Sequence, residues 1–112
     1  MLKDRRVTKE LKRLSAPFAS VSDAQRTVID PLIQNAAFMK VTLEDLQTEI
    51  AAEGLIDEYM NGLNQCGKKQ SATLQAYNSL VKNYSTVVKM LNNLLPKEIQ
   101  ASRLSGFMDD DE

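Results

Sequence analysis

Two long apolar stripes dominate the sequence. The members of each are spaced alternately three and four residues apart, which places them on one face of an α-helix. Each stripe covers 22 residues, about 33 Å of helix at 1.5 Å per residue. We therefore expect two long helices that pack as an antiparallel hairpin. The stripes are Ile29, Leu32, Ala36, Met39, Leu43, Leu46 and Ile50, and then Leu74, Tyr77, Val81, Tyr84, Val88, Leu91 and Leu95.

Capping residues mark the ends of these helices. Ser22, followed three residues later by Gln25, forms the pattern of a capping box at a helix start. Gly54 is suited to end that helix, because glycine readily adopts the left-handed conformation found there. Ser71 is suited to cap the second helix, and Pro96 should end it at Leu95. The expected helices are about 22–53 and 71–95.

Pro31 leaves two interpretations of the first long helix. It either lies in the first turn, with Asp30 as the cap, or lies inside a longer helix that begins near Ser22. The longer helix is favoured, because Val28 and Ile29 already fit the apolar stripe.

A shorter basic helix, about 3–15, should precede the hairpin, with Leu11 and Leu14 on one side and a bend at 15–22. The tip, 54–70, has apolar residues followed by Asn61-Gly62, a dipeptide favoured in tight hairpin turns. A small β-hairpin is therefore expected there. The predicted fold class is all-α, with one helical domain over 1–98 and a flexible acidic tail over 99–112.

The apolar surface is wider than a two-helix hairpin requires. Phe38 and Val41 widen the first long helix, and Leu80, Val87 and Leu94 widen the second. These residues are expected to pack in the core or in an oligomer interface. The partner is either the short helix or another copy of the chain, so a three-helix monomer stays open as the alternative.

Charge is segregated along the chain, although the net charge is only −1. Residues 1–13 carry +4, 41–60 carry −6, 61–108 carry +5 and 109–112 carry −4. No acidic residue occurs between Tyr59 and Lys97. Such segregation favours local attraction to phosphate or to an acidic partner, although solvated helix faces would produce the same pattern.

The composition argues against several kinds of active site. The chain has no histidine, which excludes Ser-His and Cys-His nucleophile pairs and histidine-containing zinc sites. Its single cysteine, Cys66, forms no internal disulfide, which suits a reducing compartment. Gly62 to Lys69 nearly matches a phosphate-binding loop, but Lys69 replaces the hydroxyl residue that holds Mg²⁺. We expect no cofactor, no metal and no enzymatic activity, and no run of apolar residues is long enough for a membrane span.

Two blocks resemble the small subunit of bacteriophage terminase, of the type common in phages of Gram-positive hosts. The weaker block is 35–50, NAAFMKVTLEDLQTEI. The stronger block lies within 55–98 and matches two family patterns, EYxNGxNQxGxKxS and YNxxxKNYxxxxKxLxxLLPK. The matching residues are Glu58, Tyr59, Asn61, Gly62, Asn64, Gln65, Gly67, Lys69 and Ser71, then Tyr77, Asn78, Lys82, Asn83, Tyr84, Lys89, Leu91, Leu94, Leu95, Pro96 and Lys97.

The resemblance implies a non-catalytic adaptor in genome packaging, located in the host cytoplasm. Such subunits assemble into homo-oligomeric rings, recognise double-stranded phage DNA and recruit the large terminase subunit, which carries the ATPase and nuclease. The tail residues Asp109, Asp110, Asp111 and Glu112 are expected to dock that partner.

One family feature is missing. Many small terminases carry an N-terminal helix-turn-helix, whereas only one short helix precedes the hairpin in this chain, so major-groove reading by that motif is in doubt. Phosphate contacts are the expected mode of DNA binding. The candidate residues are Lys3, Arg5, Arg6, Lys9, Lys12 and Arg13 in the basic head, with Lys68 and Lys69 at the tip.

An alternative needs no DNA. Both the near-zero net charge and the missing helix-turn-helix also fit a structural or regulatory helical hairpin that binds another protein.

Overall fold

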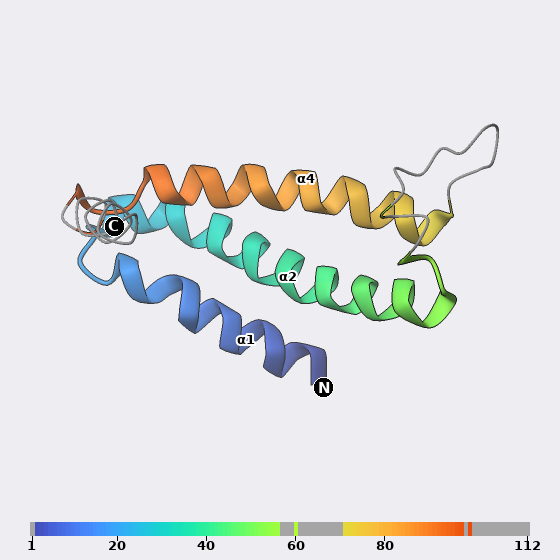
Figure 1. Cartoon of the computed structure of the whole chain (residues 1–112). Coiled ribbons are helices and arrows are strands. Elements are labelled where there is room, and N and C mark those ends of the chain that lie inside the picture. Colours follow the sequence, from blue (N-terminus) through green and yellow to red (C-terminus); the bar gives the residue numbers. More distant parts are fainter. Residues whose placement is uncertain (1, 57–59, 61–70, 98, 100–112) are drawn as a thin grey trace, which may run out of the picture.

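The computed structural model describes residues 2–56, 60, 71–97 and 99 of the 112-residue chain. This described part is all-helical and contains no strand. Its elements are α1 (Leu2–Ser15), the 3-10 turn η1 (Ala16–Phe18), α2 (Asp23–Glu53) and α4 (Ala72–Asn93). Figure 1 shows α1 and α4 running along opposite sides of α2, and both pack against it. The expected all-α class and the long helical pair are confirmed.

The ends of α2 follow the predicted capping chemistry. The Ser22 hydroxyl accepts a hydrogen bond from the Gln25 backbone N–H at 3.2 Å, and the Gln25 side chain accepts one from the Ser22 N–H at 3.1 Å. At the other end, Gly54 adopts a φ of 72°, and the Leu55 N–H donates to the Ile50 carbonyl at 2.9 Å. This bond across five residues, together with a left-handed glycine, is the Schellman arrangement that closes helices. Local sequence therefore determines both ends.

Pro31 lies inside α2, eight residues after the first residue of the helix. The longer helix was therefore the correct interpretation. Because proline has no N–H, the Thr27 carbonyl, four residues earlier, receives no backbone donor from it. The helix continues through this position because Ile29 and Ile33, before and after Pro31, are buried in the hydrophobic cluster.

The start of α4 also follows its predicted cap, with the Ser71 hydroxyl accepting from the Leu74 N–H at 3.1 Å. The helix ends at Asn93, two residues before the expected position. There the Leu94 N–H donates to the Leu91 carbonyl and the Leu95 N–H to the Asn92 carbonyl, at 3.0 and 3.3 Å. These tighter three-residue bonds finish the helix before Pro96.

The expected β-hairpin is not seen. Ile56 and Met60 are helical, which contradicts a first strand there, while 57–59 and 61–70 lie outside the described residues. The apolar residues Leu55, Ile56 and Tyr59 are too few to distinguish a strand from a helical turn by spacing. The turn-like Asn61-Gly62 pair biased the prediction towards a strand.

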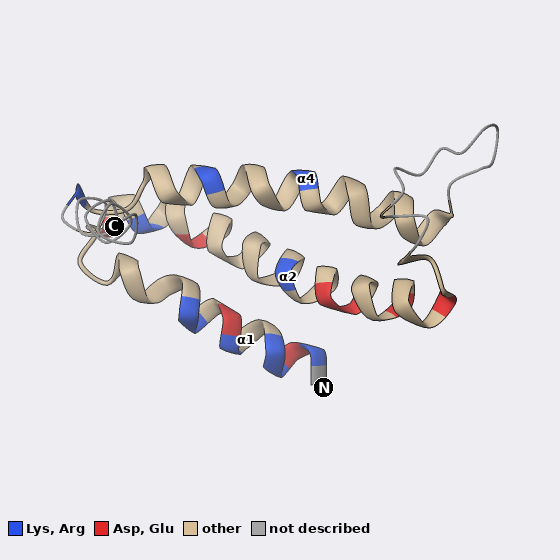
Figure 2. Cartoon of the chain, in the orientation of Figure 1, with Lys and Arg blue, Asp and Glu red and all other residues tan. Residues whose placement is uncertain are grey.

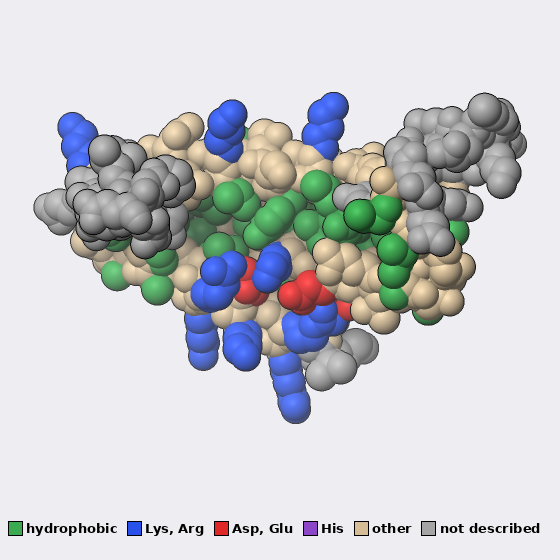
Figure 3. Space-filling view, viewed as in Figure 1, with side chains coloured by type: hydrophobic (Ala, Val, Ile, Leu, Met, Phe, Trp, Pro, Cys, Tyr) green, Lys and Arg blue, Asp and Glu red, His purple; other side chains and the backbone are tan. Residues whose placement is uncertain are grey.

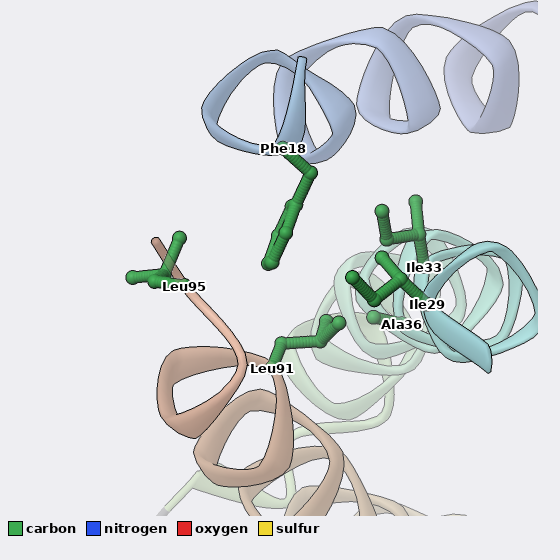
Figure 4. Close-up of a cluster of buried hydrophobic side chains, with 6 residues drawn as sticks. All are labelled: Phe18, Ile29, Ile33, Ala36, Leu91 and Leu95. Atoms are coloured by element: carbon green, nitrogen blue, oxygen red, sulfur yellow. The ribbon is translucent and has the colours of Figure 1, made fainter. Parts of the chain in front are cut away.

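The main hydrophobic cluster lies where η1, the first half of α2 and the end of α4 meet. Phe18, the last residue of η1, is 3% exposed and points between α2 and α4 (Figure 4). Ile29 and Ile33 meet it from α2, and Leu91 and Leu95 meet it from the end of α4. Leu11, Leu14 and Ile99 also pack against this cluster. The cluster thus fixes α1 and the end of α4 at the same end of the bundle.

Candidate nucleic-acid interface

The cations of α1 divide between two faces of the helix. Val7, Leu11 and Leu14 turn towards the rest of the protein and are half-buried. Lys3 and Arg6 flank this apolar side and have partners on α2, and Arg13 is exposed but has a partner, Glu10, within α1. Arg5, Lys9 and Lys12 lie opposite to the apolar side. Figure 2 shows basic positions along α1 with acidic positions on the facing part of α2. The predicted basic head is therefore two sets of residues with different surroundings.

Arg6 is the centre of an ion-pair cluster that joins α1 to α2. Its Nη1 lies 2.7 Å from Asp45 Oδ1, and its Nη2 lies 2.9 Å from Glu44 Oε1. The same Nη2 donates to the Val41 carbonyl at 3.4 Å. Lys40 Nζ is 3.5 Å from the other Glu44 oxygen. Because Arg6 has two carboxylate partners within the chain, binding a phosphate would require it to leave them.

Lys3 is held beside the same cluster. Its Nζ donates to Thr42 Oγ1 at 3.1 Å and lies 3.8 Å from Asp45 Oδ2. It also lies 4.6 Å from the centroid of the Phe38 ring, a cation–π geometry. Lys3 and Arg6 together fasten the start of α1 to the middle of α2. We call the group Lys3, Arg6, Glu44 and Asp45 the α1 clasp.

Arg13 forms a second ion pair within α1. Its guanidinium contacts both Glu10 oxygens, with Nε 2.9 Å from Oε1 and Nη2 bonded to Oε2. Glu10 is only 9% exposed, and among the described residues its hydrogen bonds come from Arg13. An isolated carboxylate would be costly at such a position, so Arg13 has a structural task.

The pairing changes the titration of the carboxylates. Hydrogen bonds from Arg6 lower the pKa of Glu44 and of Asp45, and Lys40 and Lys3, respectively, add to the effect. Hydrogen bonds from Arg13 lower the pKa of Glu10, against an opposing effect of burial. The same contacts raise the pKa of both arginines. All five groups are therefore charged near neutral pH.

Arg5, Lys9 and Lys12 form the second set, which we call the outer stripe. Their spacing of four and three residues puts them on one side of α1. All three are exposed, and none has an ion pair with another described residue. Together with Asp4 and Thr8 they line a shallow depression. Figure 3 shows Lys and Arg side chains projecting from this edge of the molecule, away from the helix pair.

The outer stripe suits a phosphate backbone. Its three cations extend over seven residues, about 10 Å of helix at 1.5 Å per residue. Asp4 reduces the local positive charge at one end, and the Thr8 hydroxyl between the cations donates to the Asp4 carbonyl at 2.9 Å. A convex helical edge with long cationic side chains reaches phosphates more easily than it reaches base edges within a groove.

A further line of lysines runs along α4 and was not among the predicted site residues. Lys82, Lys89 and Lys97 are exposed and have no ion pair with another described residue. Figure 3 shows basic side chains at the α4 edge, on the opposite side of the molecule from α1. Their signal in the sequence is the stretch between Tyr59 and Lys97, which contains lysines and no acidic residue.

The residues predicted to pack in a core or interface have mixed surroundings. Val41 is buried at 2% exposure, and Val87 is half-buried against the main cluster. Leu80 is half-buried, whereas Phe38 is 54% and Leu94 39% exposed. The contact between Phe38 and Lys3 could not be derived from spacing, because the two residues are 35 positions apart.

Several predicted site residues lie outside the described part of the chain. They are Lys68, Lys69, Asp109, Asp110, Asp111 and Glu112. Their expected roles in DNA binding and partner docking stay predictions.

The described residues contain no cluster of metal-ligating side chains, and none of their buried side-chain polar atoms lacks a hydrogen-bond partner. No helix in this part of the chain combines the length and the apolar character that crossing a bilayer requires.

Comparisons with known proteins add no relative. A scan against models of protein families, a search of curated proteins and a search of solved structures each give no match to this chain. The terminase resemblance therefore depends on the sequence blocks alone.

Proposed function

We propose that the chain is a small terminase subunit, a non-catalytic adaptor that holds double-stranded DNA through α1 and recruits the large ATPase and nuclease subunit. The observation that carries the proposal is the outer stripe, Arg5, Lys9 and Lys12, which is exposed and has no ion pair with another described residue. The sequence block at 58–97 supplies the class of protein, and the stripe supplies the surface that such a protein would use.

The clasp supports this assignment by fixing the stripe in place. Lys3 and Arg6 turn one side of α1 towards α2, which leaves the opposite side facing solvent. Arg13 is bound to Glu10 and is also unsuited to phosphate. DNA contacts are therefore assigned to three of the six cations in the basic head. Such contacts position a duplex, weaken steeply with salt and specify little sequence.

The test is a titration of a labelled duplex by fluorescence anisotropy at two salt concentrations. Neutralising the stripe, by Arg5→Gln, Lys9→Gln and Lys12→Gln together, should weaken binding about tenfold or more at low salt. The matched control is Lys82→Gln, Lys89→Gln and Lys97→Gln, which removes the same charge from the α4 edge and should change affinity far less. Equal losses in both variants would refute the assignment to α1.

Reversing Arg6 or Arg13 is not a clean test of DNA binding. Either change would leave carboxylates without their cation and disturb the seating or the fold of α1. Loss of DNA binding in such variants would be ambiguous.

Self-association is part of the proposal, and the middle of α4 supports it. Leu74 and Leu91 are buried, but the apolar residues between them are half-buried or exposed. Apolar surface on a helix pair is commonly covered by another subunit. Light scattering behind a sizing column should report a multimer at micromolar concentration, and a strict monomer would refute the ring.

A second candidate is a structural or regulatory helical module without DNA binding. The observation that favours it is the internal use of Lys3, Arg6 and Arg13, which halves the number of available cations in the basic head. Absence of duplex binding at low salt, from correctly assembled protein, would establish this candidate instead.

A further inference from the structure

The ends of α1 and α4 lie at one end of the molecule. Leu11 and Leu14 of α1 pack on the cluster that contains Phe18 and Leu95, and so does Ile99. The Ile99 N–H also donates to the Pro96 carbonyl at 3.0 Å. Residue 99, from which the acidic tail continues, is thus anchored on the same hydrophobic cluster as the last turns of α1. Figure 1 shows the end of α4 next to the turn that follows α1.

We propose that the outer stripe of α1 is a docking surface for the chain's own acidic tail, Asp109, Asp110, Asp111 and Glu112. This inference rests on the proposed function, since it concerns the surface assigned there to DNA. In the protein without DNA, the four tail carboxylates pair with Arg5, Lys9 and Lys12. DNA must displace the tail before its phosphates can bind these cations. A partner that binds the acidic tail therefore makes the outer stripe available to DNA.

The lengths permit this contact. Asp109 lies ten positions after Ile99, and a flexible chain of ten residues has an r.m.s. span of about 16–19 Å. The stripe itself extends about 10 Å from Lys12 to Arg5. The near end of the stripe is adjacent to Leu11, which shares its cluster with Ile99. The r.m.s. span of the intervening chain thus exceeds the length of the stripe.

The charges also match. The stripe carries three cations without an ion-pair partner among the described residues, and the tail carries four carboxylates in succession. Along α4, by comparison, Lys82 and Lys89 are the only charged residues in 22. The stripe is thus the densest group of cations without such a partner in the described part of the chain. Because the three cations of the stripe are exposed, the contact should weaken with salt as the Debye length falls below about 8 Å.

The covalent link makes a weak contact effective. A short flexible tether gives an effective concentration of about a millimolar, so a tail that binds the stripe with a Kd of about 0.1 mM would reduce DNA affinity roughly tenfold. Removing the tail charges should therefore raise the DNA affinity by about the same tenfold factor at low salt.

The experiment compares the full chain with Asp109→Asn, Asp110→Asn, Asp111→Asn and Glu112→Gln combined. Two-dimensional NMR without DNA is the direct measurement, and duplex affinity is the second. We expect chemical-shift changes at Arg5, Lys9 and Lys12 but not at Lys82 or Lys89, together with duplex binding about tenfold tighter. Neutralising the stripe should abolish both effects of the tail variant.

The outcomes separate this inference from the proposed function. Shift changes on α1 in a protein that binds no DNA would support docking and refute the DNA role. Tighter DNA binding without shift changes on α1 would overturn docking, because general repulsion between tail and duplex would then explain the affinity. Shift changes confined to α4 would also overturn it.

Discussion

Single side chains at the helix boundaries determine where the long helices begin and end. Ser22 and Gln25 satisfy each other's backbone N–H groups, and Gly54 takes the left-handed turn that a side chain would strain. A Cβ at Gly54 would meet no atom within 4 Å, so the need for glycine there comes from the backbone alone. These features act locally, which explains why the sequence alone predicted them.

Replacing Ser22 with alanine should lower the free energy of unfolding by about 1 kcal/mol, because the Gln25 N–H loses its acceptor. Urea denaturation followed by circular dichroism measures the change. Ser20→Ala is the matched control, since Ser20 is exposed and precedes the helix. An equal effect of both substitutions would contradict the role of the cap.

Pro31 should lower the free energy of unfolding, because it lies inside α2. Replacing it with alanine restores an N–H for the Thr27 carbonyl and improves helix propensity, so thermal stability should rise, by about 1 kcal/mol or more. Asn35→Ala, at an exposed position one turn later, measures the effect of propensity alone and should raise stability less. A loss of stability in Pro31→Ala would show that the proline has a structural task in the fold.

At the scale of elements, α1 is attached to α2 by two different kinds of contact. Its last turns use apolar contacts around Phe18, whereas its first turns depend on the clasp of Lys3 and Arg6 with Glu44 and Asp45. The clasp should therefore respond to pH and salt more strongly than the apolar end does.

Acid should weaken the clasp. Because Arg6 lowers the pKa of Glu44 and Asp45 in the folded protein, the stabilisation is fully present above their ordinary values of 4.5 and 3.8. It is lost as the pH falls through the lower folded values, since the unfolded chain then binds more protons. The pKa of Glu10 is also lowered in the folded protein, by its hydrogen bonds from Arg13, so the stabilisation from this pair is lost with acid in the same way.

The clasp predicts a specific pH dependence for Arg6→Gln. This variant should melt at a lower temperature than the wild type at pH 7, and the difference should shrink as the pH falls below about 4. Arg5→Gln, one residue away and without an ion pair among the described residues, is the control and should show no such dependence. A constant difference across this range would contradict the assigned pairing.

Contacts between near neighbours in the chain follow from the sequence more directly than contacts between distant segments do. The opposition of Arg5, Lys9 and Lys12 to Val7, Leu11 and Leu14 follows from helical periodicity and could have divided the basic head in advance. The pairing of Arg6 with Asp45 could not, because 39 positions separate them and only the packing of α1 on α2 brings them together. The predicted β-hairpin is not seen, and Ile56 and Met60 are helical, because a short apolar run next to Asn-Gly also fits a helical turn.

At the scale of the whole molecule, the chain separates its surfaces by charge. Basic side chains project from the α1 edge and from the opposite, α4 edge (Figure 3), and Glu44 and Asp45 of α2 pair with Lys3 and Arg6 of α1. The acidic middle of the sequence thus compensates part of the basic head within the chain. The net charge of −1 conceals this arrangement.

The central claim is that three cations of α1 contact DNA phosphates, and the salt dependence of duplex affinity tests it most directly. Each phosphate contact contributes about 0.9 to the slope of log K against log salt, so neutralising the stripe should reduce the slope by about 2.7 for each protomer on the duplex. Neutralising Lys82, Lys89 and Lys97 should leave the slope close to that of the wild type. A slope unchanged by loss of Arg5, Lys9 and Lys12 would contradict the account.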